Sequence, residues 1–245
     1  MENRFDTSKL SADDVRAREV LRLRREIGRM QRRRSEHPVL PLDPAFSALL
    51  PDDGLLTGTV YTLSPSPSLV LALLSTASQR GHWCAVIGMP TLGIEAAAAF
   101  GVDLERLILV PAPGERWLAV TSALAEVVPL IAVHPGSQPR SADISRVNAR
   151  LRDRGTTVLV SGADRLSWPE SQGSIRLSDP QWHGLGDGWG LLSGCTATVT
   201  AQVRNAPRPS SVQVRLPGSQ GAVEPVETAT VTEFAARFDP LAVAG

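Results

Sequence analysis

The residues from Ser64 to Ser68 lie where a nucleotide-binding α/β domain places its phosphate-binding loop. An apolar strand is predicted over Thr59–Leu63 and an apolar helix from about Ser68, which gives the required order of strand, loop and helix. The loop has no glycine that would let the backbone wrap a phosphate, and its two prolines remove two N–H donors. The sequence therefore predicts the architecture of a triphosphate-binding domain whose loop is degenerate. The loop consists of Ser64, Pro65, Ser66, Pro67 and Ser68.

The rest of the chain offers no replacement for this loop. Its only lysine is Lys9, so a G-x-x-x-x-G-K-[ST] motif is absent from the sequence. His82 and His134 have no second ligand at helical or turn spacing, and we expect structural histidines and no metal site. Cys84 and Cys195 lie far apart in apolar or strand-like contexts, and we expect buried free thiols. The loop serines lack the G-x-S-x-G context of an activated nucleophile.

An arginine-rich helix is predicted over residues 11–34. Nine arginines and two glutamates lie between Arg16 and Arg34, in a chain whose formal net charge is zero. Three interpretations stay open: an apolar seam docks on a partner, the arginines follow a nucleic-acid backbone, or the seam packs on its own domain beneath a solvated charged face. The seam consists of Val20, Leu23, Ile27 and Met30. The candidate DNA-binding residues are Arg22, Arg25, Arg29, Arg32 and Arg33, with Arg204 and Arg208 from a later hairpin.

Both ends of the chain differ in composition from its centre. Residues 35–53 carry three prolines within seven positions and predict a linker ending in a short helix, and residues 217–228 predict a second linker. Beyond it, a tail presents Phe234, Phe238 and Leu241, which we expect to dock on a partner, the alternative being that it folds back on the core. The expected divisions are 1–40, a core over 41–216, and 217–245.

No run approaches the roughly 18–20 apolar residues that a membrane helix needs. The first residues also lack the apolar region of a secretory signal, so we expect a cytoplasmic protein without a membrane segment.

The core alternates strands with helices. Strands are predicted at 59–63, 82–88, within 102–111, at 129–134 and 156–161, and helices from 68, at 94–100, 115–127 and 141–154. The strands are near-continuous apolar runs, which predict an α/β fold with a mostly parallel sheet covered on both faces. Residues 195–204 and 211–216 alternate strictly and predict a late antiparallel hairpin. Before this hairpin, residues 164–192 contain several tryptophans and glycines, and a turn is predicted at Asp187–Trp189.

This order of elements resembles the RecA family over about 55–216. The stretches Gln79–Ile87 and Phe100–Leu109 are similar to the RecA-type run in which a buried strand precedes a helix ending in a "lGvd-dnLl" pattern. The resemblance implies a RecA-like core, with the basic helix where RecA proteins have an oligomerisation helix. Self-association through that helix therefore stays open.

The resemblance also implies three catalytic positions, and this sequence departs from each. The phosphate-loop lysine would fall within 64–68, Pro90 holds the place of the water-activating glutamate, and His134 holds the place of the metal-ordering aspartate. Phosphoryl transfer depends on positioning and on neutralising charge, so we expect no ATP hydrolysis, no cofactor and no enzymatic activity.

A RecA-like core without its ATPase resembles the ImuA and SulA-like group, and within it the actinobacterial form called ImuA-prime. The resemblance implies an accessory protein of the damage-induced SOS mutasome, which acts in mutagenic translesion DNA synthesis. Its expected partners are an ImuB-like Y-family protein and an error-prone C-family DNA polymerase. Three alternatives stay open: a SulA-like inhibitor of cell-division filament assembly, a divergent RecA-type ATPase, and a sequence-independent DNA-binding protein.

Overall fold

The computed structural model describes residues 38–162, 168–185, 190–204, 206–218 and 223–226. The chain divides into two units, Met1–Pro38 and Val39–Gly245, and the following concerns the second. The predicted arginine-rich helix and the tail carrying Phe234, Phe238 and Leu241 lie outside the described residues.

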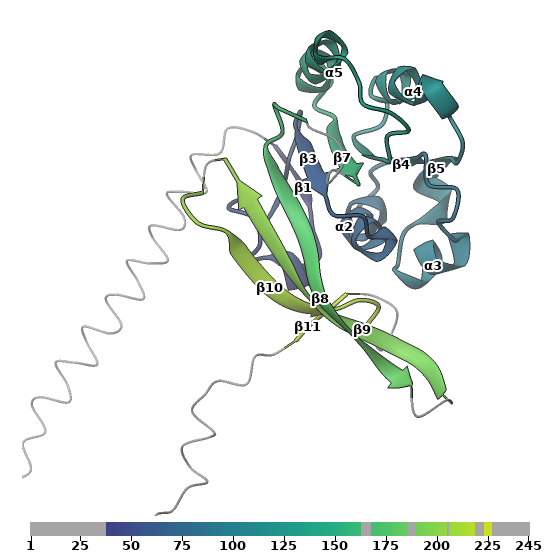
Figure 1. Cartoon of the computed structure of the whole chain (residues 1–245), viewed down its shortest axis with the longest axis vertical. Coiled ribbons are helices and arrows are strands. Elements are labelled where there is room, and N and C mark those ends of the chain that lie inside the picture. The colour runs from purple at the N-terminus through teal and green to yellow at the C-terminus, as the bar shows by residue number, and fades with distance from the viewer. Residues whose placement is uncertain (1–37, 163–167, 186–189, 205, 219–222, 227–245) are drawn as a thin grey trace, which may run out of the picture. The chain divides into compact units, whose positions relative to one another are not determined.

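A nine-stranded mixed sheet forms the centre of the described part of this unit (Figure 1). Its strand order is β11-β10-β9-β8-β3-β7-β6-β4-β5. The six strands β8, β3, β7, β6, β4 and β5 are parallel to one another. Strands β9, β10 and β11 extend the sheet beyond β8 through antiparallel pairs. The α/β fold with a mostly parallel sheet and a late antiparallel hairpin is thereby confirmed. The strands are β3 Val60–Leu63, β4 Cys84–Ile87, β5 Leu107–Val110, β6 Leu130–Val133, β7 Thr157–Ser161, β8 Gly173–Leu185, β9 Gly190–Val203, β10 Ser210–Arg215 and β11 Glu224–Pro225.

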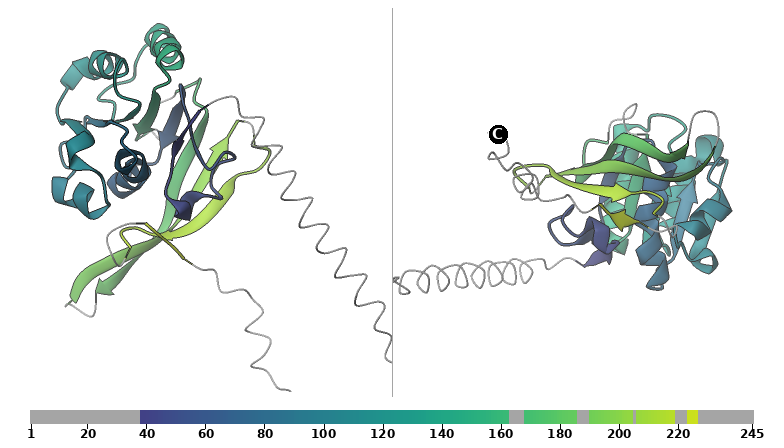
Figure 2. Two further views of the ribbon diagram at one scale, coloured as in Figure 1. Left: turned by 180° about the vertical axis from the view of Figure 1, so that it is seen from behind. Right: turned by 90° about the horizontal axis from the view of Figure 1, so that it is seen from below.

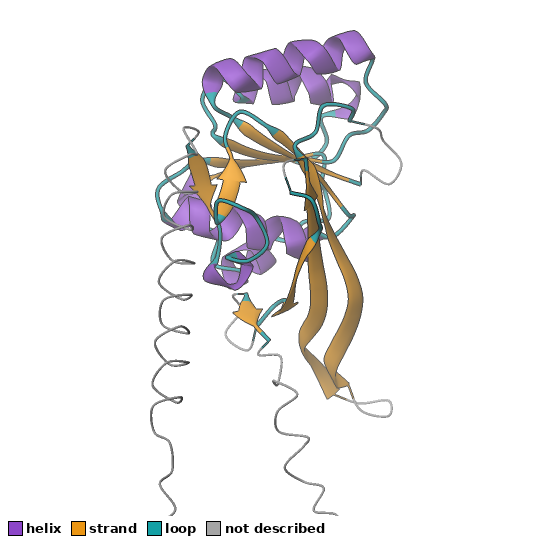
Figure 3. Ribbon diagram, turned by 90° about the vertical axis from the view of Figure 1, so that its left-hand side faces the viewer, coloured by secondary structure: helices purple, strands orange, loops and turns teal. Residues whose placement is uncertain are grey.

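Helices cover both faces of the parallel strands (Figure 3). Because side chains alternate along a strand, each central strand contributes to two cores. In β6, for example, Leu130 and Ala132 pack in the core beneath α2 and α3, whereas Ile131 and Val133 pack in the core beneath α4 and α5. The helices are α2 Pro67–Gln79, α3 Ile94–Ala99, α4 Trp117–Leu124 and α5 Ser141–Arg154, with 3₁₀ turns η1 Pro44–Phe46, η2 Leu104–Arg106 and η3 Gly114–Arg116.

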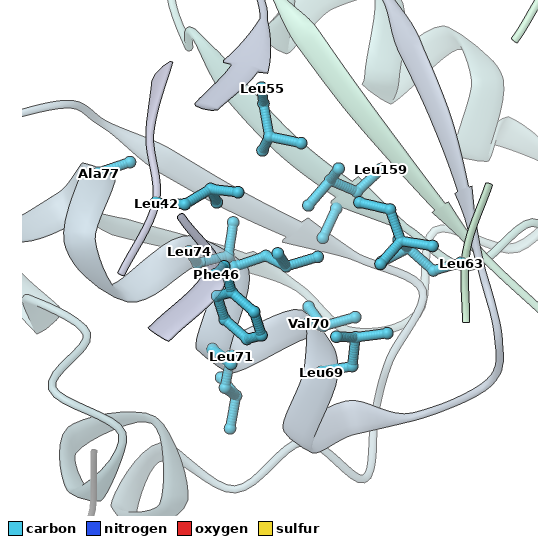
Figure 4. Close-up of a cluster of buried hydrophobic side chains, with 14 of the residues drawn as sticks. Leu42, Phe46, Leu55, Leu63, Leu69, Val70, Leu71, Leu74, Ala77 and Leu159 are labelled. Carbon is cyan, nitrogen blue, oxygen red and sulfur yellow. The ribbon is translucent and has the colours of Figure 1, made fainter. Parts of the chain in front are cut away.

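The segment expected to be a linker at 35–53 packs on the core through several buried residues of its described part. Strands β1 (Val39–Pro41) and β2 (Gly54–Leu56) form a two-stranded antiparallel sheet. Between them, Phe46 is buried against the same core as α2 (Figure 4), and Leu49 belongs to that core too. The prolines that suggested a linker have a local role instead, since Pro44 begins η1 after the Asp43 cap.

The stretch 164–192 also differs from the expectation of tryptophans and glycines around a turn. Thirteen of its residues form β8, which pairs with β3 over Gly173–Ile175 and with β9 along its length. The period-2 pattern that marks a strand is broken at Pro180 and Gly184, where the β8–β9 register shifts. The predicted turn at Asp187–Trp189 lies outside the described residues.

Candidate functional site

The loop between β3 and α2 is three residues long and is held by its own polar atoms. The hydroxyl of Ser64 accepts a hydrogen bond from the backbone N–H of Leu177 at 2.9 Å, and the Ser64 N–H donates to the Ile175 carbonyl at 3.2 Å. Ser66 caps α2 by accepting from the Leu69 N–H at 3.2 Å. Pro67 is the first helical residue and has no N–H to offer.

These contacts give the loop a structural role. A phosphate at a helix N-terminus is bound by backbone N–H groups that are free to point at it. Here the Ser66 hydroxyl is bonded to the N–H of Leu69, and the chain passes from strand to helix with no glycine turn around which an anion fits. Ser66 caps the N-terminus of α2, and Ser64 links the end of β3 to β8 by hydrogen bonds.

A pocket of about 730 Å³ lies at the carboxyl ends of β4, β5 and β6. In open α/β sheets, ligands bind outside the carboxyl ends where neighbouring connections leave for opposite faces. The adjacent strands β4 and β6 have this arrangement, because β4 leads to α3 and β6 leads to α5 on the other face. The lining residues are Gly88, Pro90, Pro111, Ala112, Pro113, Gly114, Glu115, His134, Gly136 and Ser137.

His134 is held at this edge by two glycines with positive φ. Its N–H donates to the Ile87 carbonyl at 2.9 Å. Gly88 (φ 76°) lies so close that an added Cβ would come within 2.4 Å of the His134 carbonyl oxygen. Gly162 (φ 83°) lies against the imidazole, where an added Cβ would come within 2.8 Å of Cε1. Both positions therefore require glycine: Gly88 permits the close approach to the His134 backbone, and Gly162 leaves room for the His134 ring.

The structure brings together two of the three positions implied by the resemblance. Pro90 and His134 both line the pocket, whereas the loop 64–68 does not. The described lining contains no lysine or arginine, and its only carboxylate is Glu115. Within the described residues, no group of three or more His, Cys, Asp or Glu side chains could hold a metal ion. The pocket thus offers proline and glycine surface with one negative charge, which suits an apolar or cationic group better than a triphosphate.

The hairpin arginines lie elsewhere. Arg204 directly follows β9, next to the start of β8, which is the end of that strand away from the carboxyl-end pocket. Its guanidinium donates to the Pro169 carbonyl at 2.5 Å, and its backbone N–H donates to Gln172. Arg208 is exposed in the turn before β10. The two arginines are therefore not part of the pocket, and Arg204 has a structural contact.

The two cysteines are free and buried, as expected. Burial raises the pKa of the Cys84 thiol from 9.0 to about 12, with a smaller contribution from the Asp103 carboxylate. Burial also raises the pKa of Cys195. A thiol with a raised pKa is a poor nucleophile at neutral pH, which fits a packing role.

Sequence reasoning did not single out one surface feature. Trp182, near the end of β8, is 56% exposed, and Leu191 and Leu192, at the start of β9, are 87% and 57% exposed. Trp182 is one of the tryptophans within 164–192, and its sequence context alone predicts no function for it. The available signal was the absence of lysine and arginine from Ser178 to Thr200 around these apolar residues.

The described residues form no helix that is both long and apolar enough to traverse a lipid bilayer.

Comparisons with known proteins show similarity over the core of this chain. The family model described as the MT3502 N-terminal domain matches residues 48–170. The uncharacterized protein Rv3395c of Mycobacterium tuberculosis is 32% identical over 151 residues, which cover 60% of this chain and 72% of that protein. Among solved structures, the crystal structure of the RadB recombinase superposes with a TM-score of 0.55 and 17% identity, covering 75% of this chain and 97% of RadB. At this identity the likeness concerns the fold, which is RecA-like.

Proposed function

The chain belongs to the family of the MT3502 N-terminal domain, and we propose that it is a non-catalytic, RecA-like accessory protein of damage-induced, error-prone translesion DNA synthesis. In this role it binds an ImuB-like Y-family protein in the cytoplasm and, directly or through that protein, an error-prone C-family polymerase. The assignment to this pathway is supported by the resemblance of a RecA-like core without its catalytic residues to the actinobacterial ImuA-prime form. The RecA resemblance itself is carried by Gln79–Ile87 and Phe100–Leu109.

The observation that carries the non-catalytic part is the connection between β3 and α2. Its polar atoms bond to Leu177 and Leu69 of the protein itself, and proline begins the helix. Pro90 and His134 at the neighbouring strand ends can supply neither a carboxylate base nor a carboxylate that orders a metal. All three observations favour a RecA-like scaffold retained for protein contacts.

The proposed partner contacts are the apolar seam of the N-terminal helix and the C-terminal tail. The test is co-purification of the full chain with the ImuB-like protein encoded in the same genome, followed by titration calorimetry. Removal of residues 1–36 or 227–245 is expected to weaken the complex, and removal of both to abolish it. The second cut is placed at 227 because Val223 is buried and β11 pairs with β10.

A point variant gives a sharper version of this test. Replacing both Phe234 and Phe238 with alanine is expected to weaken the complex as much as removal of 227–245, whereas Thr232→Ala is expected to leave it unchanged. Undiminished binding by the doubly truncated chain contradicts the proposed contacts. Magnesium-dependent release of phosphate from ATP above the enzyme-free blank contradicts the non-catalytic assignment.

A further inference from the structure

Strands β8 and β9 continue beyond the rest of the sheet as a two-stranded arm (Figure 2). We define the arm as residues 178–185 and 190–193, because Gly194 and Cys195 are buried and the Cys195 carbonyl accepts a hydrogen bond from the Leu216 N–H. On one side, β3 pairs with β8 only over Gly173–Ile175, and on the other, β10 pairs with β9 only from Thr196 to Ala201. Residues 178–181 still lie opposite β9 residues that pair with β10, and the ribbon beyond them has two strands. An isolated two-stranded ribbon is at best marginally stable in water. Pairing with the core therefore does not account for the length of this arm.

The arm displays large apolar side chains in the part that leaves the core. Trp182 is 56% exposed and lies opposite Cys195, so it extends the face that carries Ala197 and Val199 in the core. Leu191 and Leu192 are 87% and 57% exposed. Exposed apolar residues scattered singly are normal, but three on one narrow ribbon make this ribbon a candidate interaction surface.

The backbone of the arm presents these leucines outside the ladder. Between the pairs His183–Gly194 and Leu185–Gly190 the register shifts, with more residues on β9 than on β8. Gly184 has φ 94°, and an added Cβ would come within 2.0 Å of the Leu191 carbonyl oxygen. Only glycine permits this approach, so the irregularity is built into the chain and presents Leu191 and Leu192 to the solvent.

The charge of the arm selects the class of partner. From Ser178 to Thr200 the sequence has no lysine or arginine, and it has two aspartates. Binding of nucleic acid or of an anionic membrane surface depends on cationic side chains that neutralise phosphates. The guanidinium of Arg215 lies against Gly194, at the end of the ribbon next to the core. The ribbon's own residues include no cation beside its apolar side chains, which suits an apolar cleft on a protein.

The edges of the arm argue against strand addition. Pro180 removes one N–H from β8, Asp179 has φ 52°, and the β8–β9 register shifts between Ser178 and Gln181. Prolines, irregularities and charges of this kind protect exposed edges from pairing with a second strand. The side chains, rather than the backbone edge, are then the groups available for contact, and edge-to-edge pairing with a second copy is disfavoured.

We propose that the arm is a docking element that inserts Trp182, Leu191 and Leu192 into an apolar cleft on the folded protein partner. The identity of this partner rests on the proposed function, in which it is the ImuB-like protein. The arm is a contact separate from the seam and the tail, and it lies wholly within the described core unit.

The test compares arm variants of the full chain in calorimetric titrations with the purified ImuB-like protein. Trp182→Ala is expected to weaken the complex about tenfold or more, and the triple variant Trp182→Ala, Leu191→Ala, Leu192→Ala about a hundredfold, as for buried interface anchors. Matched controls are Gln181→Ala beside the tryptophan and Val127→Ala, which truncates an apolar residue that is 73% exposed in the turn between α4 and β6. Both controls are expected to bind as the wild type does. Because the substituted side chains are exposed, thermal unfolding of all variants is expected to match the wild type.

The failure of this inference is distinguishable from the failure of the proposed function. If the wild-type chain forms no complex, the proposed function is contradicted and the arm inference falls with it. If the wild-type chain binds and the triple variant binds within twofold of it, only the arm inference is overturned. A photo-crosslinker at position 192 of the full chain is expected to capture the ImuB-like protein. Capture of a second copy of the chain, or loss of DNA binding in the triple variant, would also overturn the inference.

Discussion

The hydroxyl of Ser64 accepts a hydrogen bond from the backbone N–H of Leu177 at 2.9 Å. This bond joins the first residue after β3 to the part of β8 that leads into the arm. The Ser64 N–H donates to the Ile175 carbonyl at 3.2 Å, so both polar groups of this residue face β8. Ser64 is at the position where a phosphate-binding loop would begin. Its hydrogen bonds thus join two parallel strands instead.

Ser64→Ala is expected to destabilise the protein by about 1–2 kcal/mol, because the partly buried N–H of Leu177 loses its acceptor. Urea unfolding followed by circular dichroism measures the change. The matched control is Ser68→Ala in the first turn of α2, where alanine favours the helix and the expected change is within about 0.5 kcal/mol. Equal stability of the two variants would show that the hydrogen bond contributes nothing.

ATP with magnesium is expected to leave the melting temperature of the wild-type chain unchanged. A ligand that binds only the native state raises the free energy of unfolding by RT ln(1 + [L]/Kd), where [L] is the free ligand concentration, so a thermal scan detects even binding without hydrolysis. The physical reason is the capped, proline-started N-terminus of α2 and the lack of lysine or arginine in the described pocket lining. A concentration-dependent rise in melting temperature that requires magnesium would contradict the expectation.

Much of the parallel core follows from local sequence. The helix Ser141–Arg154 has the predicted bounds, because its apolar spacing ends at Gly155, whose φ of 70° suits glycine. The strands β4, β6 and β7 are fully buried runs between helix ends and needed no knowledge of their neighbours. In such segments the local pattern and the tertiary environment favour the same structure.

The rest depends on pairings that local pattern does not encode. β1 is three residues long and contains proline, and only its pairing with β2 identifies it as a strand. β8 has an irregular pattern because its register with β9 shifts. Predicting the pocket likewise requires the strand order. Pro90 and His134 line it together with residues 111–115 because β5, β4 and β6 are neighbours in the sheet. Exposure of Trp182 follows from where β3 and β10 stop pairing with the ribbon, which a single strand cannot show.

Gly162→Ala is expected to destabilise the protein by about 2–4 kcal/mol, through both the strain of a positive φ and the clash with the His134 ring. Removal of the ring in Gly162→Ala, His134→Ala is expected to recover about 1 kcal/mol or more of this loss, since the clash is with the side chain. Chemical denaturation of the four proteins in the cycle measures the coupling.

Gly88→Ala provides the control for this cycle. There the added Cβ would meet the backbone carbonyl oxygen of His134 at 2.4 Å rather than its ring. His134→Ala is therefore expected to give no recovery in the Gly88→Ala background. Equal recovery in both backgrounds would contradict the assignment of the Gly162 clash to the imidazole.

The buried thiol of Cys84 predicts a specific loss of stability at high pH. Its pKa is raised from 9.0 to about 12 by burial, so between these values the native state keeps a proton that the unfolded state loses. Unfolding then releases a proton, and the free energy of unfolding falls as pH rises, by up to about 1.4 kcal/mol per pH unit. From about pH 8 to about pH 10, the wild-type chain is expected to lose about 1 kcal/mol more than Cys84→Ala in urea titrations. Cys195→Ala serves as the comparison at the second thiol, and a pH dependence identical in wild type and Cys84→Ala would contradict the prediction.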